Sequence, residues 1–201
     1  MKSDRKISKV IGLIAVLLLL ALASHAETRS GTPIEPAAGA ATIALALCCE
    51  ADQLSGEQRQ RALIHGIELA REAAAADPAD AQAHFAVFCN LGKQVQSRAL
   101  PNLEVISRLR HELDTTLALA PGDTGALAAK GAMLLALPWF LGGDVRQGER
   151  LLRTALIKDP TNAAARRYLA EALRARGADD EAEALEVSVT PGAVCSPART
   201  P

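Results

Sequence analysis

The stretch that decides the fold is AAARRYLAEALRARGADDEAEAL, residues 163–185. Its first half places apolar residues, among them Tyr168, Leu169 and Leu173, at three- and four-residue intervals, which is typical of one buried helix face. Gly177 then stands where a helix ends on a left-handed residue, and a second apolar face follows. The stretch therefore predicts a hairpin of two short helices. A hairpin this small cannot bury its apolar stripe alone, so it needs similar neighbours to pack on.

The composition of the whole chain favours helical neighbours. The chain has 201 residues, of which 49% are hydrophobic and only 2% aromatic. Alanine and leucine dominate, whereas the β-branched and aromatic residues that fill sheets are scarce. Beyond residue 26 the chain carries 18 basic and 22 acidic side chains, so its body is mildly acidic. This balance gives no reason to expect nucleic acid or an anionic membrane as a partner.

Residues 1–26 have the three parts of a secretory signal peptide. A basic start precedes an apolar run at 10–23, and the small residues Ser24 and Ala26 suit cleavage after Ala26. The run is short for a membrane span, which needs about 20 residues, so cleavage is favoured over an uncleaved anchor. We therefore expect an exported protein, periplasmic or secreted, that has no stable membrane insertion after cleavage.

The rest of the chain divides into a leader, a helical body and a tail. Residues 27–36 lack helical periodicity and read as a flexible leader, and residues 188–201 read as a proline-rich, disordered tail. The body, residues 37–187, is predicted to contain about eight helices in four antiparallel pairs. Their expected ranges are 37–51, 56–76, 81–92, 103–119, 124–137, 145–158, 163–175 and 180–185.

Three proline stops recur along this body, each after one helix and shortly before the next. They are Asp77-Pro78, Ala120-Pro121 and Asp159-Pro160. Proline blocks helix continuation and biases the preceding residue away from the helical region. The stops lie 43 and 39 residues apart, so the helix pairs between them are comparable units.

Small and large apolar residues follow a recurring order around these stops. In the last unit they are Leu169, Ala170, Leu173, Gly177 and Ala182. In the unit before it they are Gly131, Leu134, Gly143, Asp144, Ala155 and Pro160, with Gly148 where alanine is usual. In this order the chain resembles a tetratricopeptide-repeat protein, with degenerate N-terminal repeats. Because its units exceed the ~34 residues of that repeat, extra residues are expected near 93–102 and 138–142.

The resemblance implies an all-α, tetratricopeptide-like α-solenoid whose first helices line a concave groove for a peptide or protein segment. The residues expected in that groove are Gln82, Phe85, Cys89, Ala128, Ala132, Arg167, Glu171 and Arg174. We accordingly expect an exported scaffold or adaptor for protein–protein interaction, without cofactor. The alternative is an accessory ligand-binding component of a periplasmic transport system, because the Leu-Pro-x-x-x-Gly-Gly-Asp insertion also resembles small exported repeat proteins associated with solute transport.

Arg167, Glu171 and Arg174 lie on one predicted helix face, at i, i+4 and i+7 spacing. Two arginines in this arrangement suit a carboxylate or an acidic peptide, because a guanidinium group donates two parallel hydrogen bonds. The other interpretation is a solvated ion-pair ladder that contributes little.

The few aromatic residues are open to two interpretations. Phe85 and Phe88 lie three residues apart on one helix. They form either an apolar patch on the groove or part of the core. Trp139 and Phe140 lie in a connection, where they form a docking loop for a partner or a lid over one end of the stack.

The cysteines do not have the spacing of a zinc or thioredoxin-type site. Cys48 or Cys49 is placed to pair with Cys89 in the next unit, with Cys49–Cys89 as a possible disulfide, and the sequence leaves open which of the two pairs. The alternative is small buried thiols between the helices. Cys195 lies in the tail, where an intermolecular bond is open to it.

Catalytic motifs are missing from the sequence. There is no Gly-x-Ser-x-Gly elbow, no phosphate-binding glycine loop and no His-Glu-x-x-His. His65 and Glu68 lack a second pair to complete a metal cluster, and we expect both on a solvated face. His84 and His111 have no carboxylate constellation nearby except Glu112, which is adjacent to His111 and is expected to point elsewhere. We therefore expect a packing or surface role for His84. The chain is therefore not predicted to be an enzyme.

Overall fold

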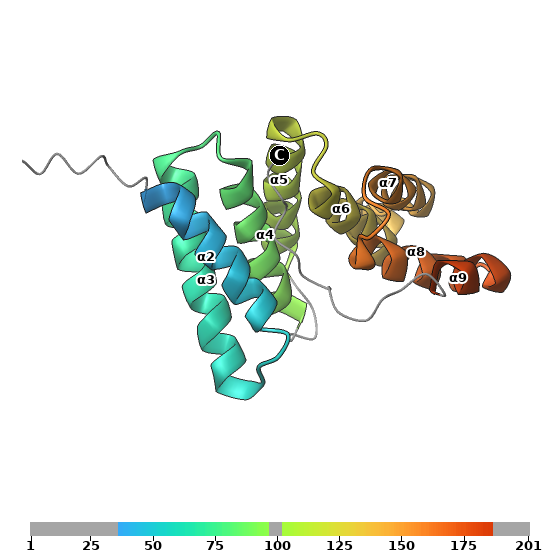
Figure 1. Cartoon of the computed structure of the whole chain (residues 1–201), viewed down its shortest axis with the longest axis horizontal. Helices are drawn as coiled ribbons and strands as arrows, with labels where there is room; N and C mark the ends of the chain where they lie inside the picture. The colour runs from blue at the N-terminus through green and yellow to red at the C-terminus, as the bar shows by residue number, and fades with distance from the viewer. Residues whose placement is uncertain (1–35, 97–101, 187–201) are drawn as a thin grey trace, which may run out of the picture. The chain divides into compact units, whose positions relative to one another are not determined.

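The computed structural model describes residues 36–96 and 102–186, and their regular elements are all helical (Figure 1). The α-helices are α2 (Pro36–Glu50), α3 (Gly56–Ala76), α4 (Ala81–Gln96), α5 (Leu103–Leu119), α6 (Thr124–Ala136), α7 (Val145–Lys158), α8 (Ala163–Ala175) and α9 (Asp179–Glu186), and a 3-10 helix, η1 (Trp139–Leu141), precedes α7. The predicted all-α fold is confirmed. The predicted signal peptide, the leader before Pro36, the tail from residue 188 and Cys195 lie outside the described residues.

Consecutive helices pack as four pairs, α2 with α3, α4 with α5, α6 with α7 and α8 with α9 (Figure 1). Each pair contacts the next one, and the first helices of neighbouring pairs also meet between α2 and α4 and between α6 and α8. Within the described residues, α4 and α6 lack this close packing, and the middle junction relies mainly on α5 and α6. The predicted solenoid of helix pairs is thus confirmed, with its loosest packing at the centre.

The three proline stops form turns with the same backbone geometry. The residue before each proline has similar dihedral angles, with ψ of 95° at Asp77, 78° at Ala120 and 91° at Asp159, and its N–H donates to the carbonyl four residues earlier. Two residues after each proline, a side-chain oxygen accepts a hydrogen bond from a backbone N–H in the first turn of the next helix. The three capping residues are Asp80, Asp123 and Asn162. These turns therefore mark equivalent points of three successive units.

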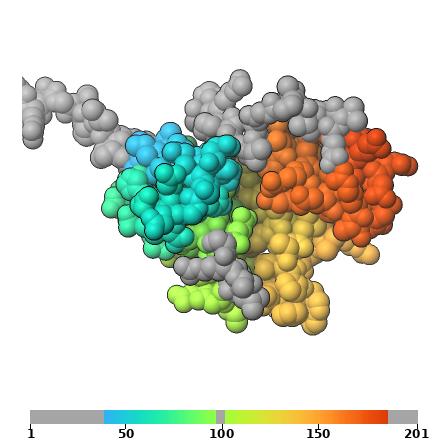
Figure 2. Space-filling model, turned by 90° about the horizontal axis from the view of Figure 1, so that it is seen from below, coloured from blue at the N-terminus to red at the C-terminus, as the bar shows by residue number. Residues whose placement is uncertain are grey.

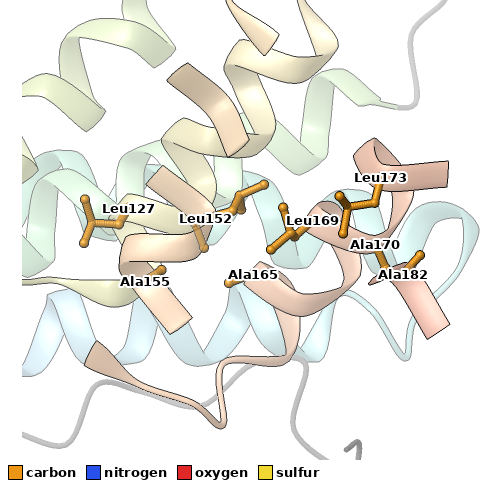
Figure 3. Close-up of a cluster of buried hydrophobic side chains, with 9 residues drawn as sticks. Leu127, Leu152, Ala155, Ala165, Leu169, Ala170, Leu173 and Ala182 are labelled. Carbon is orange, nitrogen blue, oxygen red and sulfur yellow. The ribbon is translucent and has the colours of Figure 1, made fainter. Parts of the chain in front are cut away.

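Apolar side chains from α6, α7, α8 and α9 form one core (Figure 3). Its buried members are Leu127, Ala128, Leu152, Ala155, Ala165, Leu169, Ala170, Leu173 and Ala182. Two glycines allow α6 and α7 to pack closely. A Cβ on Gly131 would lie 2.9 Å from the Gly148 carbonyl oxygen, and a Cβ on Gly148 would lie 2.9 Å from the Gly131 carbonyl oxygen. Gly177 ends α8 with a φ of 81°, as the sequence predicted.

A buried asparagine joins the N-terminal helices. Asn90 of α4 is fully buried, and its amide nitrogen donates to the carbonyls of Ala44 at 2.8 Å and Ala86 at 2.9 Å. Its side chain lies directly against Gly66 of α3, where an added Cβ would be 2.6 Å from the Asn90 Cγ. The packing of α3 on α4 therefore requires a residue without a side chain at position 66.

Helix α4 is longer than predicted. The sequence suggested that it ends at Gly92, but it continues to Gln96. Val95 is buried with Leu91 and Leu109, and the Lys93 ammonium donates to the Cys48 carbonyl at 2.8 Å. These tertiary contacts offset the low helix propensity of glycine, so Gly92 does not end the helix.

Candidate interaction site

A cleft of about 300 Å³ opens where α6, α8 and the start of α7 meet. It is lined by Ala132, Leu135, Ala136, Val145, Tyr168, Glu171, Ala172 and Ala175. Four of these residues are alanines, whose short side chains leave room above the helix backbones. The C-terminal helices around it, coloured from yellow to red, form a continuous side-chain surface in Figure 2. The cleft thus has mostly apolar walls and a single carboxylate.

The charged residues predicted on α8 lie beside this cleft. Glu171 lines it, and the Arg167 guanidinium lies 4.4 Å from the centre of the Tyr168 ring, which also lines it. Arg167 and Glu171 are only 3.9 Å apart and about half exposed, so their ion pair contributes little to stability. Arg174 is also exposed on α8. Of the residues predicted for the groove, Ala132, Arg167 and Glu171 are brought together here.

The residues predicted for the groove on α4 are engaged within the fold. Gln82 accepts a hydrogen bond of 3.5 Å from the Thr42 hydroxyl, and Phe85 packs against the core of α2, α3 and α4. The rings of Phe85 and Phe88 are stacked 6.1 Å apart at an interplanar angle of 15°. Core packing therefore accounts for this aromatic pair, and Ala128 is likewise buried in the C-terminal core.

A disulfide joins Cys48 of α2 to Cys89 of α4, with 6.1 Å between their Cα atoms. Of the two pairings that the sequence leaves open, the structure contains Cys48–Cys89, and the possible Cys49–Cys89 pair is not formed. Cys48 is fully buried and faces α4, whereas the next residue is rotated by about 100° around the helix and is half exposed. None of the described cysteines is a free thiol. The bond links the first helices of two neighbouring pairs.

The loop between α6 and α7 exposes two aromatic side chains. Trp139 is 84% exposed and Phe140 67%, and their rings meet edge to face at 5.9 Å. The side chains therefore do not form the lid that was one interpretation of the sequence. Phe140 also borders a second cleft, of about 270 Å³, between η1 and α5. A docking role for this loop stays a prediction.

A buried carboxylate that the sequence did not reveal lies between α4 and α5. Glu112 is almost fully buried, and its two oxygens contact His84 Nδ1 at 2.6 Å and Arg108 Nε at 2.5 Å. The other ring nitrogen of His84 faces the Pro78 carbonyl at 3.1 Å. His84 thus ties α5 to the first proline turn, and the expectation that Glu112 points elsewhere is wrong.

Replacing Glu112 with alanine is expected to destabilise the chain by about 2 kcal/mol, because it leaves the largely buried His84 ring and the half-exposed Arg108 guanidinium without the carboxylate they share. Guanidinium unfolding followed by circular dichroism measures the loss. Glu104→Ala, on the exposed first turn of the same helix, is the control and is expected to cost about 0.5 kcal/mol. Equal losses in the two variants would contradict the role assigned to Glu112.

Metal binding and membrane spanning find no support in the described part of the chain. Within residues 36–96 and 102–186, no three acidic, histidine or cysteine side chains are grouped to hold a metal ion. His65 and Glu68 are both exposed, as expected. No described helix combines the length and the apolar character needed to cross a bilayer.

Comparison with known families agrees with the helix pairing. A family model described as tetratricopeptide repeat matches residues 141–185, which include α7, α8 and all but the last residue of α9. No curated protein is significantly similar in sequence to the chain. Repeats of this kind generally act as scaffolds that bind protein partners and have no catalytic role of their own. Residues 141–185 are thus similar to a tetratricopeptide repeat, and they lie at the C-terminal end of an all-α, tetratricopeptide-like solenoid of helix pairs.

Proposed function

We propose that this chain is an exported scaffold that binds a segment of a partner protein in the cleft between α6 and α8. The observation that carries the proposal is the open, alanine-walled cleft on the first helices of two adjacent pairs. Helix repeats commonly use the surface of their first helices for binding, because stacking leaves it accessible. The matched repeat contributes α8 and the start of α7 to this cleft.

The chemistry of the cleft favours an apolar side chain beside a carboxylate. Leu135, Val145 and Tyr168 provide apolar contact, while the alanines allow a chain to approach the helices closely. The weak Arg167–Glu171 pair is easily exchanged, so a carboxylate of the partner can replace Glu171 on the Arg167 guanidinium. The preferred partner is thus a segment with an acidic residue next to a large apolar one.

Export is the second part of the proposal. The features of residues 1–26 motivate it, and the disulfide between Cys48 and Cys89 supports it, because such bonds persist mainly in oxidising compartments. If the signal peptide is cleaved as expected, the exported protein begins at Glu27. Its mass, measured on material from the exported fraction, tests this part directly, and a chain that keeps residues 1–26 would contradict it.

Site-specific crosslinking tests the binding proposal. A photoreactive amino acid at Ala136, which lines the cleft, is expected to capture discrete partners in the exported fraction. The same amino acid at Ala118, an exposed position in the last turn of α5, is the matched control and is expected to capture none of them. Capture of the same species at both positions would contradict binding in the cleft.

Filling the cleft provides the second half of this test. Ala175→Arg places a long side chain in the cleft at the last residue of α8, where a cation is compatible with the helix dipole. It is expected to reduce crosslinking from Ala136 about tenfold, whereas Ala118→Arg leaves it unchanged. If native mass spectrometry instead finds a small solute bound and no partner protein, the transport alternative replaces the scaffold.

A further inference from the structure

Three exposed apolar side chains gather at the tip formed by η1 and the start of α5. Leu103 and Phe140 line the same cleft, and the Trp139 ring lies against that of Phe140. Leu103 is 68% exposed, and both aromatic rings are exposed to at least a similar degree. Together they present roughly 400–500 Å² of apolar surface, which is the size at which exposed patches on soluble proteins often carry a function.

The backbone holds this tip in one conformation. The N–H groups of Leu141 and Gly143 both donate to the Pro138 carbonyl, at 2.9 and 3.0 Å, and Gly142 closes the turn with a φ of 80°. From α5, the Arg110 guanidinium donates to the Leu141 carbonyl at 2.5 Å. The aromatic side chains are therefore presented to solvent on a fixed support, so little ordering entropy is lost when they bind.

A guanidinium group lies next to the apolar patch. Arg110 is half-buried and lines the cleft of about 270 Å³ together with Ser107 and apolar side chains. Among the described residues, no carboxylate forms an ion pair with Arg110, in contrast to Arg108 on the same helix. A partly desolvated cation of this kind favours an anionic group, and its planar fork matches a phosphate.

We propose that this tip binds the surface of a phospholipid bilayer. Trp139 and Phe140 lie at the boundary between headgroups and acyl chains, where tryptophan in particular is favoured, and Arg110 contacts a lipid phosphate. The patch supplies only about half of the ~800 Å² per partner that a stable protein interface buries, which disfavours a second copy of the chain as its occupant. A lipid surface requires no shape complementarity and no spanning helix, so the contact is peripheral and reversible.

The single tryptophan of the chain makes the proposal directly measurable. With phosphatidylcholine vesicles, the fluorescence of Trp139 in the purified full chain is expected to shift to the blue and to be quenched by brominated acyl chains. Phe140→Ser is expected to weaken vesicle binding about tenfold, and Arg110→Gln about fivefold through the loss of its hydrogen bond to a lipid phosphate. All variants are compared in the same form of the chain, so a difference between them arises from the substituted residue.

Two control variants test whether vesicle binding depends on the tip. Ile157→Ser removes an 81% exposed apolar side chain elsewhere, on α7, and Arg150→Gln removes an exposed arginine that does not line this cleft. Both are expected to bind vesicles like the unchanged chain, and losses equal to those at the tip would overturn the proposal. Unaltered tryptophan emission at saturating lipid would also overturn it. A blue shift that follows protein concentration without lipid would assign the tip to a second copy instead.

Discussion

Replacing Gly143 with alanine is expected to destabilise the chain by about 3 kcal/mol or more. A Cβ at this position would overlap the carbonyl oxygen of Leu137 and lie 2.6 Å from its carbonyl carbon. Both are backbone atoms, so no side-chain rotation relieves the clash. The next residue, Asp144, donates its N–H to the Leu134 carbonyl and caps α7 through its side chain, so a displaced loop also disturbs the packing of α6 on α7.

Chemical unfolding monitored by far-UV circular dichroism measures this effect. Gly39→Ala is the matched control, because Gly39 lies in α2 with no atom within 4 Å of an added Cβ. Alanine is the better helix former, so this control is expected to be neutral or to stabilise by up to about 1 kcal/mol. If the two variants unfold at the same denaturant concentration, the close approach at Gly143 is not present in solution.

Removing the disulfide by the double change Cys48→Ala and Cys89→Ala is expected to cost about 4 kcal/mol in the oxidised protein. The bonded cysteines are 41 residues apart in sequence. On the chain-entropy model, closing a loop of this length lowers the entropy of the unfolded chain enough to stabilise the fold by about 4 kcal/mol. Because both partners of the bond are removed, neither is left as a free thiol to exchange with other disulfides. The free energy of unfolding, measured in denaturant without reductant, gives the loss.

A reductant provides the control for this prediction. When both proteins are fully reduced, neither has the bond, so their difference is expected to shrink to the about 1 kcal/mol that a small cavity at the buried Cys48 accounts for. A difference that stays the same under reduction would show that the bond does not stabilise the fold, and that cavity formation explains the loss.

The helix boundaries were predictable because local chemistry sets most of them. Proline after Asp77, Ala120 and Asp159 fixes the preceding backbone, and the capping side chains three residues later start the next helix in each case. Gly177 likewise ends α8 through a positive φ. Each of these signals acts within a few residues of the chain, so the sequence displays it directly.

Contacts between distant residues were not predictable in this way. Glu112 lies on the buried face of α5 by helical periodicity, next to Leu109 and Leu113, yet its partner His84 is 28 residues away and only the packing of α4 on α5 brings them together. In α2 almost every side chain is small or apolar, so its sequence does not show that Cys48 rather than Cys49 faces α4.

The cleft illustrates a third limit, because alanine is ambiguous. Ala128 and Ala132 lie one turn apart on α6, but the first is buried against α7 and α8 while the second lines the cleft. Small residues permit both close packing and open space, and the neighbouring helices decide which of the two results. The alanines in the sequence therefore predicted the helix α6 but did not show which of its faces lines a cleft.

The three identical proline turns have a consequence for protein engineering. Since the backbone has the same conformation at each, a recombination joint placed at residue 77, 120 or 159 leaves every following helix in phase with its predecessor. Whole units, 43 or 39 residues long, can be deleted, duplicated or exchanged at these joints without redesigning a turn. The turns thus place the joints of the chain at three structurally equivalent points.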